Sequence, residues 1–150
     1  MTVYVDDMYL RPMGQFGKMK MSHMIADNLD ELHAMADAIG IKRKWFQNTH
    51  SGPHYDIAIS KRKLALAKGV VEVTLRELAY MSFVRRVTGR LPKHYLADIE
   101  WRRLQRKLYL QTVKRKAELR MRAKEGVRIQ AVKARILREP RIRIEFRLPV

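Results

Sequence analysis

The apolar positions in the first 90 residues change their spacing several times along the chain. In segments 3–5, 19–25, 44–47, 54–59 and 70–74 they form short runs or alternate with polar residues, which is typical of strands. In segments 29–39, 61–69 and 75–87 they recur every three or four residues, which is typical of helices. This succession of strands and helices predicts an α/β fold: a small, partly parallel sheet with flanking helices.

Residues with capping chemistry mark the ends of the predicted helices. Asn28 with Glu31, and Thr74 with Glu77, have the spacing of capping boxes, and Ser60 precedes the middle helix as a candidate N-cap. Glycines stand where the three helices should stop: Gly40, Gly69 and Gly89. These local signals predict that residues 1–90 form a small α/β domain.

The pattern changes after residue 90. From about Leu96 the chain is helical and basic, with a thin apolar stripe that includes Trp101, Leu104, Leu108 and Val113. Gly126 is predicted to interrupt this helix. Apolar residues then alternate with Arg and Glu through positions 141–148, which predicts a short strand. Residues 91–150 are therefore predicted to form a basic, mainly helical extension with a terminal β-strand.

Charge adds a functional prediction to this organisation. The chain has 32 Lys and Arg against 15 Asp and Glu, a net charge of +17. Residues 1–80 hold 11 basic and 9 acidic residues, whereas residues 81–150 hold 21 and 6. Such an asymmetry indicates a polyanionic partner, most often nucleic acid, DNA or RNA. The predicted phosphate contacts are Arg102, Arg103, Arg106, Lys107, Lys114, Arg115, Lys116, Arg120 and Arg122.

Nucleic acid, a membrane surface and an acidic protein are the three kinds of partner to compare for the basic helix. Trp101, Tyr95 and Tyr109 could stack on unpaired bases, which supports nucleic acid. A membrane surface is disfavoured because the apolar stripe is narrow and interrupted by arginine. An acidic host protein is an alternative partner, and the oligomeric state is left open.

The composition also limits the cellular setting and the chemistry. There are no cysteines, which excludes disulfides, thiolate metal sites and a thiol nucleophile, and which fits a reducing compartment. The first residues lack the pattern of a signal peptide, and no apolar run is long enough to span a membrane. A cytoplasmic location is expected, or the host cytoplasm if a phage encodes the protein.

Several segments of the first 80 residues carry a family resemblance. "VYVDD", "MSHMIAD", "DELHAMADAIGI", "KWFQ", "HYDI" and "VEVTLRELA" occur in the order and spacing of family 4031 of the domains of unknown function, whose members are phage and bacterial proteins. The resemblance implies a compact α/β domain and a phage or prophage setting. It implies no activity and therefore no catalytic residue.

Acidic and histidine residues of the first domain suggest a second function. Asp6 and Asp7 close the first predicted strand, while His54 and Asp56 share one face of a later strand. These four side chains could bind Mg²⁺ or Mn²⁺, as in a metal-dependent nuclease, and His23 could join them. Alternatively, Asp6, Asp7 and Asp56 cap turns and helix ends, and His54 forms a local hydrogen bond in its loop. The sequence contains no G-x-G-x-x-G, Walker-type loop, H-E-x-x-H or G-x-S-x-G motif, so catalytic residues and enzyme activity are left open.

Overall fold

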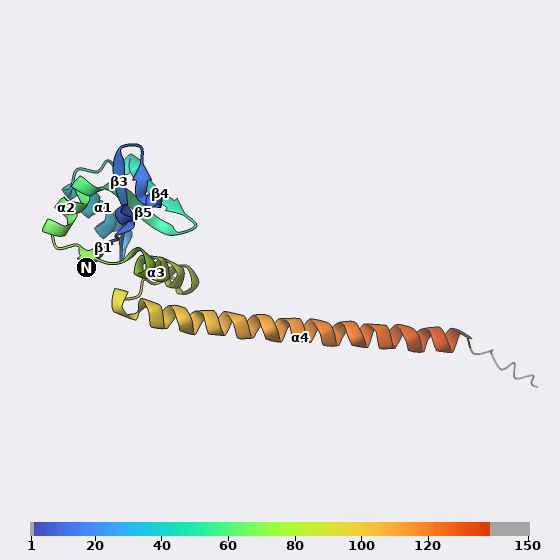
Figure 1. Cartoon of the computed structure of the whole chain (residues 1–150). Helices are drawn as coiled ribbons and strands as arrows, with labels where there is room; N and C mark the ends of the chain where they lie inside the picture. The colour runs from blue at the N-terminus through green and yellow to red at the C-terminus, as the bar shows by residue number, and fades with distance from the viewer. Residues whose placement is uncertain (1, 139–150) are drawn as a thin grey trace, which may run out of the picture. The chain divides into compact units, whose positions relative to one another are not determined.

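A computed structural model describes residues 2–138 of the chain (Figure 1). The chain divides into two compact units, one covering Met1–Gln105 and a second that begins at Arg106. The predicted terminal strand at 141–148 lies outside the described residues. Within the described part of the chain, no helix combines the length and apolar character that crossing a bilayer requires.

The first unit contains a mixed sheet. Its strands are β1 (Val3–Val5), β2 (Gln15–Phe16), β3 (Met19–Ala26), β4 (Phe46–Thr49), β5 (Gly52–Ala58) and β6 (Val71–Glu72). The strand order is β4-β5-β3-β1-β6, and β2 pairs with β3 alone. β1 lies parallel to β6, whereas the other pairs are antiparallel. The predicted mixed α/β class is confirmed.

The helices are α1 (Leu29–Ala38), α2 (Ile59–Ala67), α3 (Leu75–Thr88) and α4 (Ala97–Arg138). Asn28 caps α1 by accepting a hydrogen bond from the Glu31 N–H, and Thr74 forms a reciprocal capping box with Glu77 at the start of α3. Gly89 ends α3 with φ of 79°, a left-handed conformation that glycine adopts without strain. These predicted helix boundaries are confirmed.

Three local predictions need correction. Ser60 is not the cap of α2, because β5 leads directly into the helix and Ala58 occupies the N-cap position. The segment 44–47 is not wholly extended, since Arg43–Trp45 forms a 3-10 turn before β4 begins at Phe46. Gly126 does not interrupt α4; one glycine costs only about 1 kcal/mol in a helix, and the flanking residues are mostly good helix formers.

The sheet is buried on both faces, so alternate residues of its central strands enter different cores. Val5 and Met24 pack in a cluster with residues of α1 and α2, while Tyr4 and Ile25 pack in a second cluster with residues of α3. The helices thus cover opposite faces of the sheet (Figure 1). Ala97, the first residue of α4, is fully buried in the second cluster. The first unit therefore includes the start of α4, and the predicted boundary near residue 90 stays a prediction.

Candidate functional site

A row of polar side chains crosses the centre of the sheet on the face that α3 covers. In the antiparallel pairing of β3 with β5, His23 lies directly opposite Asp56. His54 is two residues from Asp56 on the same strand and so faces the same side. Asp6 follows β1 and donates its backbone N–H to the His23 carbonyl oxygen at 3.2 Å. Strand register thus brings together residues that are far apart in sequence.

Three of these side chains converge on one point. The Nε2 atoms of His23 and His54 lie 3.7 and 3.9 Å from the same oxygen, Asp56 Oδ1. One nitrogen or oxygen from each of the three residues lies within 4.8 Å of the other two. The two imidazole rings meet edge to face, with centroids 5.5 Å apart. This set of donors has the size and composition of a metal-binding cluster.

Hydrogen bonds to the other ring nitrogens define the state of both histidines. His23 Nδ1 lies 2.6 Å from Asp6 Oδ2, and His54 Nδ1 lies 2.8 Å from the carbonyl oxygen of Gly52. An ionised carboxylate and a carbonyl oxygen only accept hydrogen bonds, so Nδ1 must be the donor in both rings. In the neutral tautomer each Nε2 then keeps a free lone pair, so both Nε2 atoms are donor atoms of the cluster.

Asp6 is held rigidly behind His23. Its side chain is fully buried, and its Oδ1 accepts the backbone N–H groups of His23 at 2.9 Å and Met8 at 3.2 Å. Its backbone carbonyl accepts a hydrogen bond from Arg62 Nε at 3.0 Å. Burial alone would lower the pKa of His23, but the hydrogen bond and charge of Asp6, with the charge of Asp56, outweigh it and raise that pKa.

The two oxygens of Asp56 have different surroundings. Gln47 Nε2 donates a hydrogen bond to Oδ2 at 2.8 Å. Oδ1 is buried and has no hydrogen-bond donor among the described residues. A buried carboxylate oxygen without a partner is costly, and a bound cation or water would remove that cost.

A cavity of about 400 Å³ adjoins the histidine pair. His23 and His54 form part of its wall, and residues of α3 also line it. Arg86 and His50, which contact each other, also line the cavity, as do the stacked rings of Tyr80 and Trp101. The cluster therefore borders a space that could admit water or a small group of a larger ligand.

The structure separates the four residues predicted as metal ligands. His54 and Asp56 lie in the cluster, whereas Asp6 contacts it through His23. Asp7 is elsewhere, because its Oδ1 accepts the backbone N–H of Leu75 at the start of α3 at 2.6 Å. His23 occupies the central position, although the sequence marked it only as a possible addition. Its alternation within β3 indicated its face, but the pairing of β3 with β5 could not be read from the sequence.

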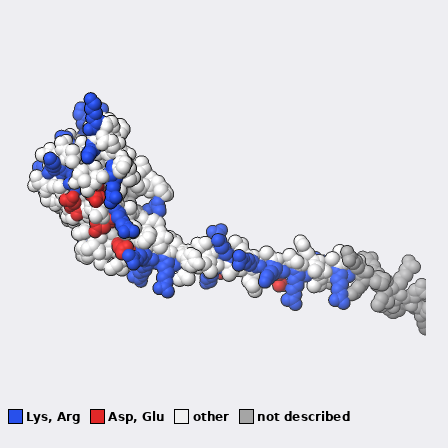
Figure 2. Space-filling view, in the orientation of Figure 1, with Lys and Arg blue, Asp and Glu red and all other residues white. Residues whose placement is uncertain are grey.

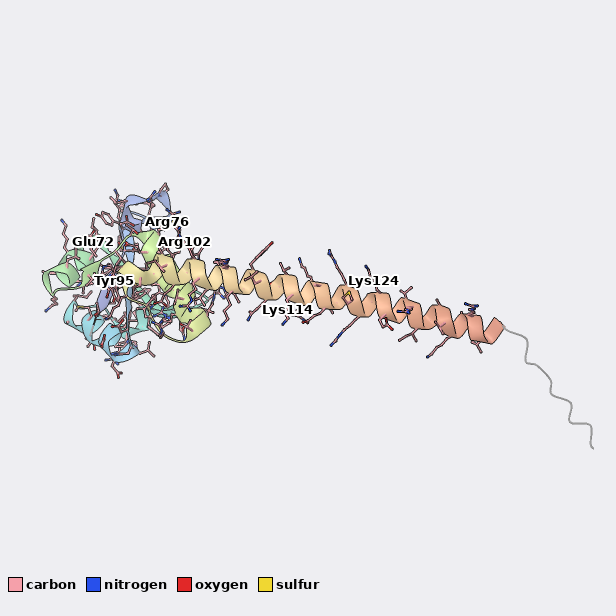
Figure 3. All side chains as sticks on the ribbon, turned by 90° about the horizontal axis from the view of Figure 1, so that it is seen from below. Glu72, Arg76, Tyr95, Arg102, Lys114 and Lys124 are labelled. Carbon is pink, nitrogen blue, oxygen red and sulfur yellow. The ribbon has the colours of Figure 1, made fainter. Side chains whose placement is uncertain are left out.

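The second candidate site is the part of α4 that begins at Arg106. Residues 106–138 contain twelve Lys or Arg and only two Glu. From Arg106 to Arg135 every side chain is exposed. Figure 2 shows Lys and Arg repeated along the visible face, and Figure 3 shows Lys114 and Lys124 standing out from the ribbon. This segment presents a dense positive charge.

The residues predicted to contact nucleic acid lie in both units, and their surroundings differ. Arg102 is paired with Asp98 one helical turn earlier, at 3.0 Å, while Arg103 is exposed. Trp101 stacks on Tyr80 with centroids 4.4 Å apart, so its ring already has an aromatic partner. The remaining predicted contacts are exposed: Arg106, Lys107, Lys114, Arg115, Lys116, Arg120 and Arg122.

Comparison with known proteins gives one match. Residues 3–87 match the family described as "Protein of unknown function (DUF4031)", so the matched segment ends within α3. The chain matches no curated protein and no solved structure.

Proposed function

We propose, from the premise that this chain belongs to the DUF4031 family, that it binds nucleic acid through the phosphate contacts of α4. The observation that carries the proposal is the excess of basic over acidic residues in 106–138, twelve against two, on a segment whose side chains are exposed from Arg106 to Arg135. The whole of this basic segment follows the matched family segment, so binding is attributed to the segment and not to the family.

The distribution of basic residues around the helix favours binding to nucleic-acid phosphates over docking of one helix face in an acidic groove of a protein. At 100° per residue, the basic positions of 106–138 fall on every side of α4, so no single face carries them. A segment of this length is about 50 Å long, enough to follow many phosphates of a polynucleotide. Arginine suits this role because its planar fork matches phosphate oxygens. Such contacts are expected to be independent of base sequence.

The proposal predicts steep salt dependence. Binding of the full chain to two unrelated labelled duplexes and one single-stranded RNA would be followed by fluorescence anisotropy between about 50 and 300 mM salt. Each neutralised phosphate of duplex DNA contributes about −0.9 to the log–log slope, so five to seven contacts give roughly −4 to −6. The two duplexes should bind with similar affinity.

A charge-neutralised helix provides the decisive variant. Replacing Arg115, Lys116 and Arg120 by Gln should flatten the slope by up to about three units and preserve helicity, since Gln is a good helix former. The matched control replaces three exposed lysines of the first unit by Gln: Lys18, Lys20 and Lys63. A salt-insensitive complex, or equal effects of the two triple variants, would contradict binding through α4.

Experiments on the same full-length protein also test two alternative functions. A metal-dependent nuclease is favoured by the cluster of His23, His54 and Asp56 beside a cavity, and it would cleave the labelled strands only when metal is added. An acidic partner protein is favoured by exposed apolar residues of α4 such as Met121 and Val127. That alternative predicts weak, salt-sensitive DNA binding and a stoichiometric protein complex that polyanions displace.

A further inference from the structure

We propose that His23, His54 and Asp56 bind one divalent transition-metal ion, with Asp6 as the positioning residue of His23. This goes beyond nucleic-acid binding, because the site lies in the sheet of the first unit and uses no residue of the basic segment. It also differs from the predicted set of Asp6, Asp7, His54 and Asp56, since it replaces the two adjacent aspartates by one histidine.

The donor atoms fit such an ion. Two imidazole nitrogens and one carboxylate oxygen are the protein ligands of many catalytic zinc sites, which keep a further position open. Bonds of 2.0–2.2 Å place tetrahedral ligands about 3.3–3.6 Å apart. The observed separations of 3.7 and 3.9 Å from Asp56 Oδ1 are slightly longer, and the three donor atoms all lie within 4.8 Å of one another, so the side chains would move closer together on binding an ion.

The hydrogen bonds around the cluster prepare it for a cation. Both Nδ1 atoms donate to fixed acceptors, which leaves both Nε2 atoms as the ligands. Gln47 orients Asp56 through Oδ2, while the buried Oδ1 lacks a donor among the described residues. Metal-bound histidines usually donate their second nitrogen to a carboxylate or a carbonyl, and here Asp6 and Gly52 provide one of each.

The chemistry of the donors also selects the metal. Mg²⁺ prefers oxygen ligands and retains most of its water, whereas imidazole suits Zn²⁺, Co²⁺ and other late first-row ions. The site is therefore expected to discriminate against Mg²⁺. Because His23 and His54 also line the cavity of about 400 Å³, an ion bound to them would border it. An open coordination position there could hold water or a substrate oxygen.

Asp6 has a specific and testable role in this arrangement. In Asp6→Asn the amide oxygen can still accept the backbone N–H groups of His23 and Met8. Its NH₂ group, however, now faces His23 Nδ1 and can only donate. The imidazole proton then moves to Nε2 and blocks the metal ligand. The expected result is a change of the His23 tautomer together with a loss of roughly 10- to 100-fold in metal affinity.

The metal alone serves as the probe. Untagged full-length protein, treated with a chelator and then freed of it, would be titrated with Zn²⁺ and with Mg²⁺ by calorimetry. One Zn²⁺ per chain is expected, with a higher melting temperature of the bound form and no comparable response to Mg²⁺. Co²⁺ should give visible absorption bands of a four- or five-coordinate ion, which report ligation independently of any activity.

Variants assign the ligands. Asp56→Asn and His54→Gln should each weaken Zn²⁺ binding more than Asp6→Asn does, because they alter atoms that bind the ion. Asp7→Asn is the matched control: it removes the same charge next to Asp6, but its side-chain oxygen can still accept the Leu75 N–H. Nitrogen-15 NMR of the imidazoles should show Nδ1–H for His23 in the wild type and Nε2–H in Asp6→Asn. Amide spectra would verify the fold of each variant.

Two outcomes would overturn the proposal. One is a folded wild-type protein that binds no Zn²⁺ stoichiometrically. The other is stoichiometric binding that stays unchanged in both Asp56→Asn and His54→Gln. The variant with Arg115, Lys116 and Arg120 replaced by Gln should bind Zn²⁺ normally. Failure of the metal site can therefore be distinguished from failure of nucleic-acid binding.

Discussion

Asp6 and Asp7 are adjacent in sequence but stabilise different parts of the first unit. The Asp6 carboxylate is buried and holds His23, whereas the Asp7 carboxylate reaches the first backbone N–H of α3. Thr74 caps the same helix by accepting the N–H of Glu77, so two side chains satisfy different donors at this end. The two aspartates thus have different partners: Asp6 contacts His23, and Asp7 contacts the start of α3.

The role of Asp7 predicts a stability change without loss of metal binding. Asp7→Ala removes the acceptor of the Leu75 N–H and should lower the free energy of unfolding by about 1 kcal/mol. Asp7→Asn retains an oxygen acceptor and should cost less than Asp7→Ala. Urea denaturation followed by far-ultraviolet circular dichroism measures both. A wild-type midpoint for Asp7→Ala would mean that this contact does not stabilise the helix.

At the level of secondary-structure elements, α4 shows that a single glycine need not interrupt a helix. The helix runs through Gly126, where an added methyl group would meet no atom within 4 Å apart from its chain neighbours and the adjacent backbone of the helix itself. Most of its side chains beyond Gln105 are exposed, so its persistence rests on its own backbone and propensities. Glycine is the weakest point of such a helix because it is the most flexible residue.

Gly126→Ala should therefore strengthen α4. The expected gain is about 0.5–1 kcal/mol in helix stability, seen as greater ellipticity at 222 nm and a later loss of helix on heating. Ala123→Gly, three residues away on the same exposed segment, is the opposite control and should lower the ellipticity. If only the control changed the spectrum, the helix in solution would end before residue 126.

In the molecule as a whole, the first unit continues beyond the matched family segment. Ala97 is fully buried with Tyr4 and Met81, and Trp101 stacks on Tyr80. These contacts come from the first turns of α4, after the 3-10 turn at His94–Leu96. The start of α4 is therefore part of the core on the face of the sheet that α3 covers.

A comparison of two shortened chains tests this contribution. A chain ending at Gln105 should unfold cooperatively, whereas one ending at Arg90 should be less stable by about 2–3 kcal/mol, since it loses the burial of Ala97 and the aromatic pair. Trp101→Ala in the longer chain should cause part of that loss. Equal stability of the two chains would restore residue 90 as the end of an independently folding domain.

Most of the secondary structure of the first unit follows from short-range signals in the sequence. The pairs Asn28 with Glu31 and Thr74 with Glu77 interact over three residues, so their chemistry is visible locally and the predicted caps are present. The alternation in β3 likewise revealed a strand with two faces. The predictions that Ser60 caps α2 and that Gly126 interrupts α4 were wrong. Both depend on the adjacent segment, which leads into α2 in the first case and continues the helix in the second.

The candidate metal site, in contrast, depends on how the strands pair. The sequence singled out His54 and Asp56 because their spacing of two residues places them on one face of a strand. It could not show that His23 faces Asp56, because that follows from the register of β3 against β5. Nor could it show that Asp6 orients His23, or that Asp7 reaches α3 across 68 residues. Local interactions specify elements, whereas a site built from residues of β3 and β5, with Asp6 just after β1, exists only after these strands have paired.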